Sequence, residues 1–252
     1  MNVIILAAGQ GTRLRPYTDN KPKCLVEVEG ISLLDRQLDI LRANPAVSKL
    51  IIVGGYCWEA LKGRSDVLLV NEAYMKTNMV YSLYVAREFL TGDVLISYGD
   101  IVYSGKILDK LVAFDGSVGV AIDEGWEAYW CSRFDDPLDD AETLKIDASG
   151  LITEIGRKPS HISEIEGQYM GLVKLAPEGA TLFSNIIRDA FSGRDDNHRI
   201  WDISYLTDLL MALIETGAPV SAVCHNEPWA EVDTREDLIS PETLKRLRAI
   251  KV

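Results

Sequence analysis

The sequence contains little cysteine and little histidine, with four cysteines and three histidines among 252 residues. The cysteines, Cys24, Cys57, Cys131 and Cys224, form no close pair. Zinc sites use ligands at short spacing, and disulfide-stabilised secreted domains are dense in cysteine. The sequence therefore argues against both a zinc site and a disulfide framework, and it favours a protein with reduced thiols.

The sequence also lacks a long apolar run and an excess of positive charge. No apolar stretch approaches the roughly 20 residues that a transmembrane helix requires. The apolar start MNVIILAAGQG is short and has no basic region before it, unlike a signal peptide. The formal net charge of −12 repels nucleic acid and acidic membranes. We therefore expect a cytoplasmic protein that binds neither nucleic acid nor a membrane.

Short apolar runs alternate with amphipathic segments in the first half of the chain. This pattern predicts strands at residues 3–7, 50–53, 66–70 and 94–97 and helices at 33–41, 80–90 and 107–114. After Gly116, strands are predicted at 118–122, 143–146, 152–155, 169–175 and 220–223, and helices at 181–191, 203–215 and 241–250. The alternation indicates an α/β fold with a doubly wound, mostly parallel mixed sheet. No linker interrupts it, so we expect a single domain over residues 1–252.

The first predicted strand runs into a loop that is rich in glycine and positive charge. Its four basic residues face one acidic residue, Asp19, in the first 25 positions: Arg13, Arg15, Lys21 and Lys23. Glycines let backbone N–H groups approach a ligand closely. The loop lacks the third glycine of the dinucleotide fingerprint, where Leu14 stands, and the Gly-Lys-Ser/Thr of a Walker A loop. We interpret it as an anion-binding loop, with a solvated basic loop as the alternative.

Residues 6–23, LAAGQGTRLRPYTDNKPK, resemble the nucleotide-binding motif of the nucleotidyltransferase superfamily. That superfamily includes sugar-1-phosphate nucleotidyltransferases and small-molecule cytidylyltransferases. The resemblance implies a Rossmann-like nucleotidyltransferase fold, in which residues 1–117 bind the nucleotide. Residues 118–252, with an acceptor-binding β-rich insertion, would bind the acceptor and complete the metal site. In such enzymes an acceptor oxyanion attacks the α-phosphorus of a nucleoside triphosphate, and pyrophosphate leaves.

The same resemblance implies roles for residues of the loop. Backbone groups between Ala8 and Thr12 would contact phosphate, Arg13 would contact the triphosphate, and Lys23 would lie near the α-phosphate and the acceptor's anionic group. A surface salt bridge is the alternative role for Lys23. The nucleotide-binding residues of the loop would be Leu6, Ala7, Ala8, Gly9, Gly11 and Thr12.

Two distant aspartates are the candidate metal ligands. Asp100 ends the apolar stretch VLISYGD, and the carboxyl ends of parallel strands are where such sheets bind ligands. Asp233 and Glu231 alternate along WAEVD, so they share one face of a strand and repel each other unless a cation lies between them. The resemblance implies that Asp100 and Asp233 bind Mg²⁺. Glu231 would either assist in binding the metal or have only a positioning role in the site. A turn cap is the alternative for Asp100.

Two segments are candidates for the nucleoside site. Gly55 and Tyr56 follow the second strand, where family members hold the base. Residues 77–83, TNMVYSL, resemble a stretch of the small-molecule cytidylyltransferases. Asn78 and Ser82 are four residues apart and share a helix face, so Asn78 could reach phosphate or ribose and Ser82 the cytosine edge. Helix capping by Thr77 or Asn78 is compatible with this role.

The second half resembles one branch of the superfamily at residues 136–145, 164–172 and 229–238. That branch comprises cytidylyltransferases for phosphocholine, phosphonates such as aminoethylphosphonate, and phosphoglutamine-type acceptors. The candidate acceptor-binding residues are Asp123, Trp126, Lys145, Glu166, Gln168 and Tyr169. An acidic and aromatic lining suits an amine-bearing acceptor. Packing is the alternative for the two aromatic residues, and solvation for Lys145.

Three functions are compatible with this pattern. The first is a Mg²⁺-dependent cytidylyltransferase that joins CTP to a small phosphorylated or phosphonate acceptor. The second is a sugar-1-phosphate nucleotidyltransferase that uses dTTP, UTP or GTP. The third is a catalytically silent nucleotide-binding regulatory subunit. The presence of Arg13, Lys23, Asp100 and Asp233 together argues against the third, since a silent subunit has no need of the metal pair.

Overall fold

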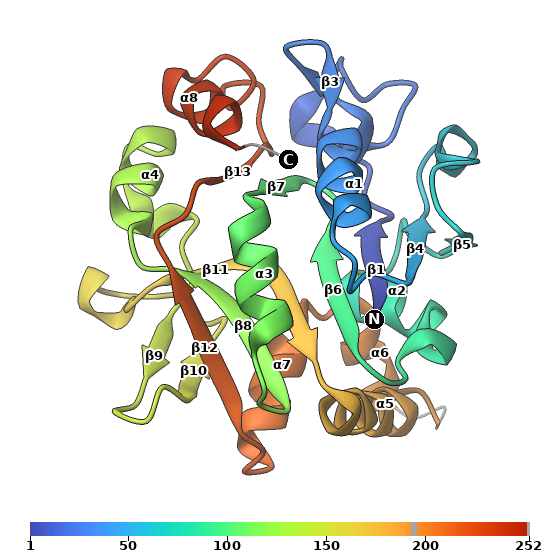
Figure 1. Ribbon diagram of the computed structural model, residues 1–252, viewed down its shortest axis with the longest axis vertical. Coiled ribbons are helices and arrows are strands. Elements are labelled where there is room, and N and C mark those ends of the chain that lie inside the picture. Colours follow the sequence, from blue (N-terminus) through green and yellow to red (C-terminus); the bar gives the residue numbers. More distant parts are fainter. Residues whose placement is uncertain (193–195, 251–252) are drawn as a thin grey trace.

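A seven-stranded sheet runs through the computed structural model, which describes residues 1–192 and 196–250 (Figure 1). The strand order is β12-β8-β11-β6-β1-β4-β5. The bounds are β1 (Asn2–Ala7), β4 (Lys49–Gly54), β5 (Val67–Val70), β6 (Val94–Tyr98), β8 (Val118–Asp123), β11 (Gln168–Leu175) and β12 (Val220–His225). Neighbouring strands pair in parallel except β11, which is antiparallel to β6 and β8. The predicted doubly wound, mostly parallel sheet is confirmed.

Helices cover both faces of the sheet because the side chains of its central strands alternate. Val3 and Ile5 of β1 pack with α1 (Leu33–Ala43) and α3 (Gly105–Ala113). Ile4 and Leu6 point to the other face, which is covered by helices that lie behind the sheet in Figure 1. Those helices are α2 (Met79–Val85), α5 (Pro177–Phe191), α6 (Asp196–Ile203) and α7 (Leu206–Glu215). In the described part of the chain, no helix is long and apolar enough to span a membrane.

Smaller elements lie around the sheet, several of them at its carboxyl edge (Figure 1). β7 (Ile101–Tyr103) pairs with β13 (Trp229–Glu231), β2 (Glu27–Val28) with β3 (Ile31–Ser32), and β9 (Leu144–Ile146) with β10 (Ile152–Ile155), each in antiparallel fashion. α4 (Trp126–Arg133) and α8 (Pro241–Ala249) lie above this edge. The short 3-10 helices are η1 (Thr12–Leu14), η2 (Lys23–Leu25), η3 (Trp58–Leu61), η4 (Arg87–Phe89), η5 (Pro137–Asp139) and η6 (Ile162–Glu164).

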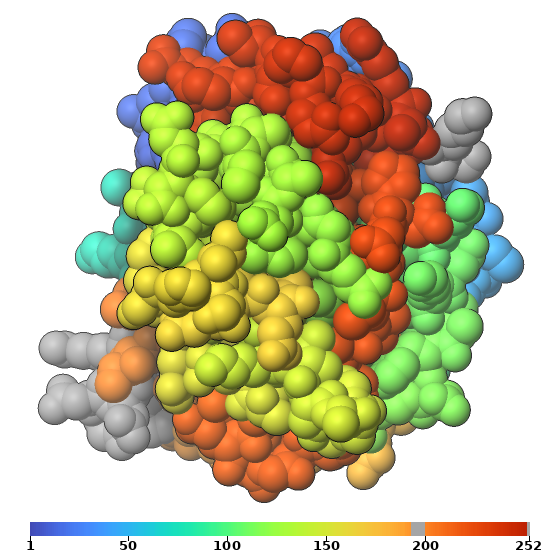
Figure 2. All heavy atoms as spheres, turned by 90° about the vertical axis from the view of Figure 1, so that its left-hand side faces the viewer, coloured from blue at the N-terminus to red at the C-terminus, as the bar shows by residue number. Residues whose placement is uncertain are grey.

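The second half of the chain forms one side of the molecule. Figure 2 shows α4, the β9–β10 hairpin and the segment that follows it, coloured from green to yellow, beneath the C-terminal segment in red. β11 also belongs to this half, yet it lies between β6 and β8 in the sheet. The two halves of the sequence are therefore interleaved in space.

The structure corrects several predicted boundaries. The predicted helix 80–90 ends at Val85 and continues only as the 3-10 turn η4. The predicted helix 203–215 begins at Leu206, because the backbone N–H of Tyr205 donates to Asp208 in a capping box. The helices α4 and α6 and the strand β7 were not predicted. In α4 the aromatic residues are buried in a short helix, so its sequence shows little contrast between its faces.

Gly55 follows β4 and packs behind the glycine-rich loop after β1 without room for a side chain. A Cβ atom there would lie 2.7 Å from the carbonyl oxygen of Ala8 and 2.7 Å from the Cβ of Tyr74. The next residue, Tyr56, donates its backbone N–H to the same carbonyl oxygen at 3.2 Å. Gly55 and Tyr56 thus support the loop from behind.

Replacing Gly55 with alanine should lower the free energy of unfolding by about 1–3 kcal/mol, since the added methyl group overpacks this contact. Gly105→Ala is the control, because a Cβ at Gly105 meets nothing within 4 Å. Its stability should stay within about 0.5 kcal/mol of wild type. Urea denaturation measures both variants. A Gly55→Ala protein as stable as the control would show that the contact is not tight.

Candidate active site

The loop after β1 closes onto the short helix η2 because Gly11 adopts a left-handed backbone conformation. Its φ is +60°, and a Cβ atom there would lie 2.9 Å from the Cβ of Lys23. The hydroxyl of Thr18 donates to the carbonyl oxygen of Gly11 at 2.8 Å and fixes this turn. The loop therefore brings Arg13 and Lys23 to the carboxyl edge of the sheet.

Lys23 lies between two aspartates that are far away in the sequence. Its Nζ is 2.5 Å from Asp100 Oδ2 and also forms an ion pair with Asp233 Oδ1. The side chains are largely buried, with 13% of Lys23, 18% of Asp100 and 13% of Asp233 exposed. Arg13, which is 60% exposed, pairs with the other oxygen of Asp233. The four residues predicted to be catalytic thus form one ion cluster.

The carboxylate of Asp100 has a free coordination position. Its Oδ1 is buried, and no described residue forms a hydrogen bond with it. A buried acceptor without a partner costs free energy, and a carboxylate oxygen suits a hard cation. Residues 1–192 and 196–250 hold no cluster of three or more side chains of the metal-binding types. The partnerless oxygen of Asp100 fits an ion such as Mg²⁺, which takes one or two protein carboxylates and fills its remaining positions with phosphate and water oxygens.

Glu231 lies near the ion cluster but is engaged with another residue. Its Oε2 accepts a hydrogen bond from Arg133 Nη1 at 2.8 Å. Burial raises the pKa of the Glu231 carboxyl, and the Arg133 charge opposes that rise. This contact favours a positioning role for Glu231 over direct metal binding.

A small cavity of about 120 Å³ opens between the loop and α2. Of the residues predicted for the nucleotide, Leu6, Ala7, Ala8, Gly9, Asn78 and Ser82 line it, while Gly11 and Thr12 line the larger cavity next to it. Gly55 and Tyr56 line neither cavity.

Asn71 also lines the small cavity and was missed by sequence reasoning. Its Nδ2 donates to Ser82 Oγ at 3.1 Å and to Thr77 Oγ1 at 3.0 Å. Asn71 is buried and directly follows β5, at the carboxyl end of a parallel strand. That position is the signal that could have revealed it.

The larger cavity, of about 390 Å³, adjoins the small one and shares Gly9, Lys23, Met79, Tyr98 and Asp100 with it. The second half of the chain supplies most of its other residues, among them Trp130, Asp140, Glu142, Gln168, Tyr169, Trp229 and Glu231. The ion cluster therefore stands where the two cavities meet.

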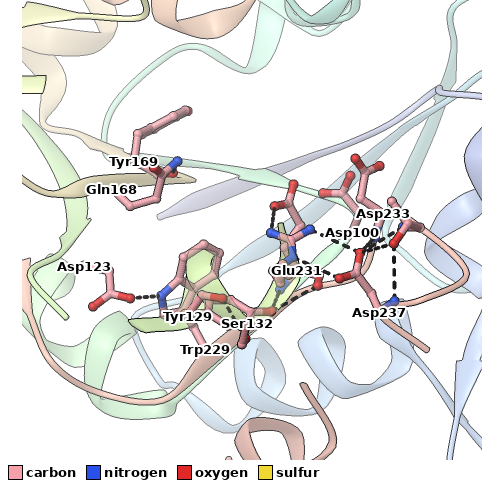
Figure 3. Close-up of polar contacts among 12 residues, drawn as sticks. Asp100, Asp123, Tyr129, Ser132, Gln168, Tyr169, Trp229, Glu231, Asp233 and Asp237 are labelled. Atoms are coloured by element: carbon pink, nitrogen blue, oxygen red, sulfur yellow. Dashed lines mark hydrogen bonds and ion pairs between the residues drawn. The ribbon is translucent and has the colours of Figure 1, made fainter. Parts of the chain in front are cut away.

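Two of the six predicted acceptor residues line this cavity, Gln168 and Tyr169. Asp123 instead accepts hydrogen bonds from Trp229 Nε1 at 2.8 Å and from the Gly125 N–H at 2.8 Å. Figure 3 shows the Asp123–Trp229 pair on the opposite side of the view from Asp100 and Asp233.

The other three predicted acceptor residues also lie elsewhere. Trp126 is buried and packs edge-to-face on Trp130. Lys145 is exposed on β9, and Glu166 accepts from the Ile146 N–H at 2.6 Å at the same hairpin. Trp126 is thus a packing residue, Lys145 lies at the surface, and Glu166 is bound to the hairpin backbone.

The larger cavity is acidic and aromatic, in part through residues that the sequence did not single out, such as Glu142 and Tyr98. Burial raises the pKa of Glu142 to about 7, and the charges of Asp208, Asp140 and Glu231 act in the same direction. A hydrogen bond with Thr207 opposes the rise. The phenol rings of Tyr98 and Tyr169 meet edge-to-face, with centroids 5.8 Å apart, on the same cavity wall. Carboxylates held apart from solvent in this way favour a positively charged ligand.

Comparison with known proteins agrees with this geometry. Residues 3–144 match the model of the MobA-like NTP transferase domain. CTP:phosphoglutamine cytidylyltransferase of Campylobacter jejuni is 35% identical over 94% of this chain and 98% of its own length. 2-Aminoethylphosphonate cytidylyltransferase of Lancefieldella rimae is 26% identical over 80% of this chain and 77% of its own length. The solved structure of CTP:phosphocholine cytidylyltransferase from Streptococcus pneumoniae superposes on this chain with a TM-score of 0.72 at 22% identity. The superposition covers 97% of this chain and 98% of that protein, so the two share the fold.

Glu142 should make stability depend on pH. Its neutral form favours the folded state, and this contribution is complete below the ordinary pKa of 4.5 and is lost as the pH rises through about 7. Glu142→Gln stays neutral, so it should exceed wild-type stability at about pH 8 by up to about 3 kcal/mol and match it near pH 4. Thermal or urea unfolding across this pH range measures the difference. Glu88→Gln, at a side chain 81% exposed, should track wild type throughout. A difference that does not change with pH would contradict the shifted pKa.

Proposed function

The chain belongs to the MobA-like NTP transferase family, and we propose that it is a cytoplasmic, Mg²⁺-dependent cytidylyltransferase. It would join CTP to a small phosphorylated or phosphonate acceptor that carries a positive charge, and release pyrophosphate. One observation carries this proposal: the cluster of Arg13, Lys23, Asp100 and Asp233 stands where a nucleotide-side cavity meets an acidic acceptor-side cavity. In-line transfer places the attacking acceptor oxygen opposite the departing pyrophosphate, so the acceptor has to reach the α-phosphorus of the bound nucleotide from an adjoining cavity.

Asp100 and Asp233 would hold the metal, and the partnerless Oδ1 of Asp100 supports this role. Bound Mg²⁺ would neutralise charge on the triphosphate and on the transferring group. Lys23, held between the two carboxylates, would present its ammonium group to the α-phosphate and to the attacking oxyanion. Arg13 is exposed beside the same cavity and would bind the triphosphate. These residues position the reactants and offset charge, and no covalent protein intermediate is needed.

The hydrogen bonds of Ser82 support a preference for CTP. Because Asn71 donates to Ser82 Oγ, the hydroxyl proton of Ser82 points away from Asn71 and forms a long hydrogen bond, of 3.4 Å, with the carbonyl oxygen of Asn78. A ligand acceptor in the small cavity would replace this bond. Cytosine carries a hydrogen-bond acceptor at N3, whereas uracil carries a donor there. Ser82 lines the small cavity, and its hydroxyl, turned from the Asn78 carbonyl oxygen to the base, would therefore discriminate between these two bases.

The acidic lining of the larger cavity supports a cationic acceptor. Asp140, Glu142 and Glu231 would pair with an ammonium group, and the rings of Tyr98, Tyr169 and Trp130 would surround it. The similar proteins named for phosphoglutamine and for 2-aminoethylphosphonate agree with this chemistry. A sugar 1-phosphate offers neutral hydroxyl groups, which gain less from ionised carboxylates, and a silent subunit would not need the complete ion cluster.

A pyrophosphate-release assay over the four nucleoside triphosphates tests the nucleotide and the acceptor together. We expect CTP to be preferred by about tenfold or more, which corresponds to about 1.4 kcal/mol in the barrier. The acceptor panel comprises phosphoglutamine, phosphocholine, 2-aminoethylphosphonate and hexose 1-phosphates. Release with at least one of the first three acceptors supports the proposal. Release only with a hexose 1-phosphate and dTTP, UTP or GTP would support the sugar-phosphate alternative, and release with none would support the silent subunit.

Asp100→Asn and Asp233→Asn should each lower kcat by about 10²–10³-fold in the presence of Mg²⁺, because each removes charge where the metal would bind. Lys23→Ala should also slow transfer. Asp93→Asn is the matched control, since Asp93 precedes the same strand as Asp100 at its opposite end and pairs with Lys174. Its rate should stay near wild type, and thermal unfolding should confirm that all variants are folded. Near-normal rates in both Asp100→Asn and Asp233→Asn would show that these two aspartates do not bind the catalytic metal.

A further inference from the structure

Arg133 and Asp237 lie behind the ion cluster, in neither of its two cavities. We infer that they form a positioning pair that fixes the direction of Asp233 and connects it to the wall of the acceptor cavity. The inference rests on the proposed function, since it takes Asp233 as a metal ligand. Neither residue would touch the substrate, so neither is catalytic in the strict sense.

Arg133 is the last residue of α4, and its side chain is 1% exposed. Nε donates to Asp237 Oδ1 at 2.9 Å, Nη2 to Asp237 Oδ2 at 3.2 Å, and Nη1 to Glu231 Oε2 at 2.8 Å. A charge this deeply buried is tolerated only when it is fully paired. The planar guanidinium group therefore holds two carboxylates at a fixed separation, which a lysine ammonium group could not do.

Asp237 in turn holds the backbone of the loop that carries Asp233. Its Oδ2 accepts hydrogen bonds from the Asp233 N–H at 2.9 Å, the Thr234 N–H at 2.9 Å and the Thr234 hydroxyl at 3.0 Å. The side chain of Asp237 is 4% exposed. The direction in which Asp233 points thus depends on a carboxylate that is itself held by Arg133.

The same guanidinium group contacts residues that line the acceptor cavity. Its other partner, Glu231, lines that cavity, and so does Trp130, whose ring centroid lies 5.0 Å from the Arg133 Cζ. The Arg133 guanidinium group therefore supports both the wall of the acceptor cavity and the loop that carries Asp233. Such support matters because Asp100 and Asp233 repel each other, and a loop free to move would carry Asp233 away from the geometry that the ion requires.

The test measures metal binding separately from turnover. Mn²⁺ replaces Mg²⁺, and electron paramagnetic resonance gives its Kd in the presence of saturating CTP for wild type, Arg133→Lys and Asp237→Asn. We expect each variant to bind Mn²⁺ about 10–100-fold more weakly, as is typical when support behind a metal ligand is lost. The KM for CTP should change less than the Mn²⁺ Kd. Raising the Mg²⁺ concentration should recover part of kcat in both variants.

Lys174→Met is the matched control for a general loss of stability. Lys174 is also buried and paired with an aspartate, Asp93, but at the opposite edge of the sheet. It should lower the melting temperature and leave the Mn²⁺ Kd at the wild-type value. If Arg133→Lys does not fold, Asp237→Asn decides the question, because it keeps the size and one acceptor oxygen of the side chain.

The outcomes separate this inference from the proposed function. Folded Arg133→Lys and Asp237→Asn proteins that bind Mn²⁺ as wild type does would overturn the inference alone. An equal loss of Mn²⁺ affinity in Lys174→Met would also overturn it, because the effect would then be one of stability. If wild type binds no Mn²⁺ with CTP, the metal assignment of the proposed function fails and the inference fails with it.

Discussion

The contact of Lys23 with two aspartates is the constraint on which the rest of the site depends. The two contacts span 77 and 210 residues of sequence. Asp100 follows β6, which lies at the centre of the sheet. Asp233 follows β13, which is held in place by its pairing with β7. Lys23 is delivered by a loop that can close only because Gly11 has no side chain. Each of these elements must fold correctly before one ammonium group can meet both carboxylates.

This cluster is balanced in the absence of a substrate. Two cations, Lys23 and Arg13, face two carboxylates, so the largely buried charges are paired. Removing one member would leave another buried charge without a partner, which costs more than the pair contributes. The same balance prepares the site for a triphosphate with its metal ion. In the proposed function the carboxylates would turn to the metal while Lys23 and Arg13 would turn to phosphate, so each group would exchange one partner of opposite charge for another.

The sequence predicted the parts of the site that lie within continuous motifs. The loop at residues 6–23 and the two aspartates were predicted from segments that resemble the nucleotidyltransferase superfamily, and the structure brings Lys23, Asp100 and Asp233 together. Glu142, Asn71 and Arg133 were missed because their importance comes from contacts with residues distant in sequence. Alternation along a strand gives the face of a side chain but not its neighbour, so Asp123 was predicted for the acceptor although it binds the Trp229 indole. The helix α4 was missed because its aromatic residues show no clear helical contrast.

The relation between the two halves limits how this site could work in isolation. The match to the family model ends at residue 144, whereas Gln168, Tyr169, Glu231 and Asp233 lie beyond it. β11, from this later part, is inserted between β6 and β8, so a chain ending at 144 would leave both strands with an unpaired edge. Asp233 in turn is held by β7 and by Arg133, which belong to the earlier part. In the proposed function, acceptor binding and metal binding would therefore depend on the same interleaved packing, and a change of acceptor specificity would have to preserve the support behind Asp233.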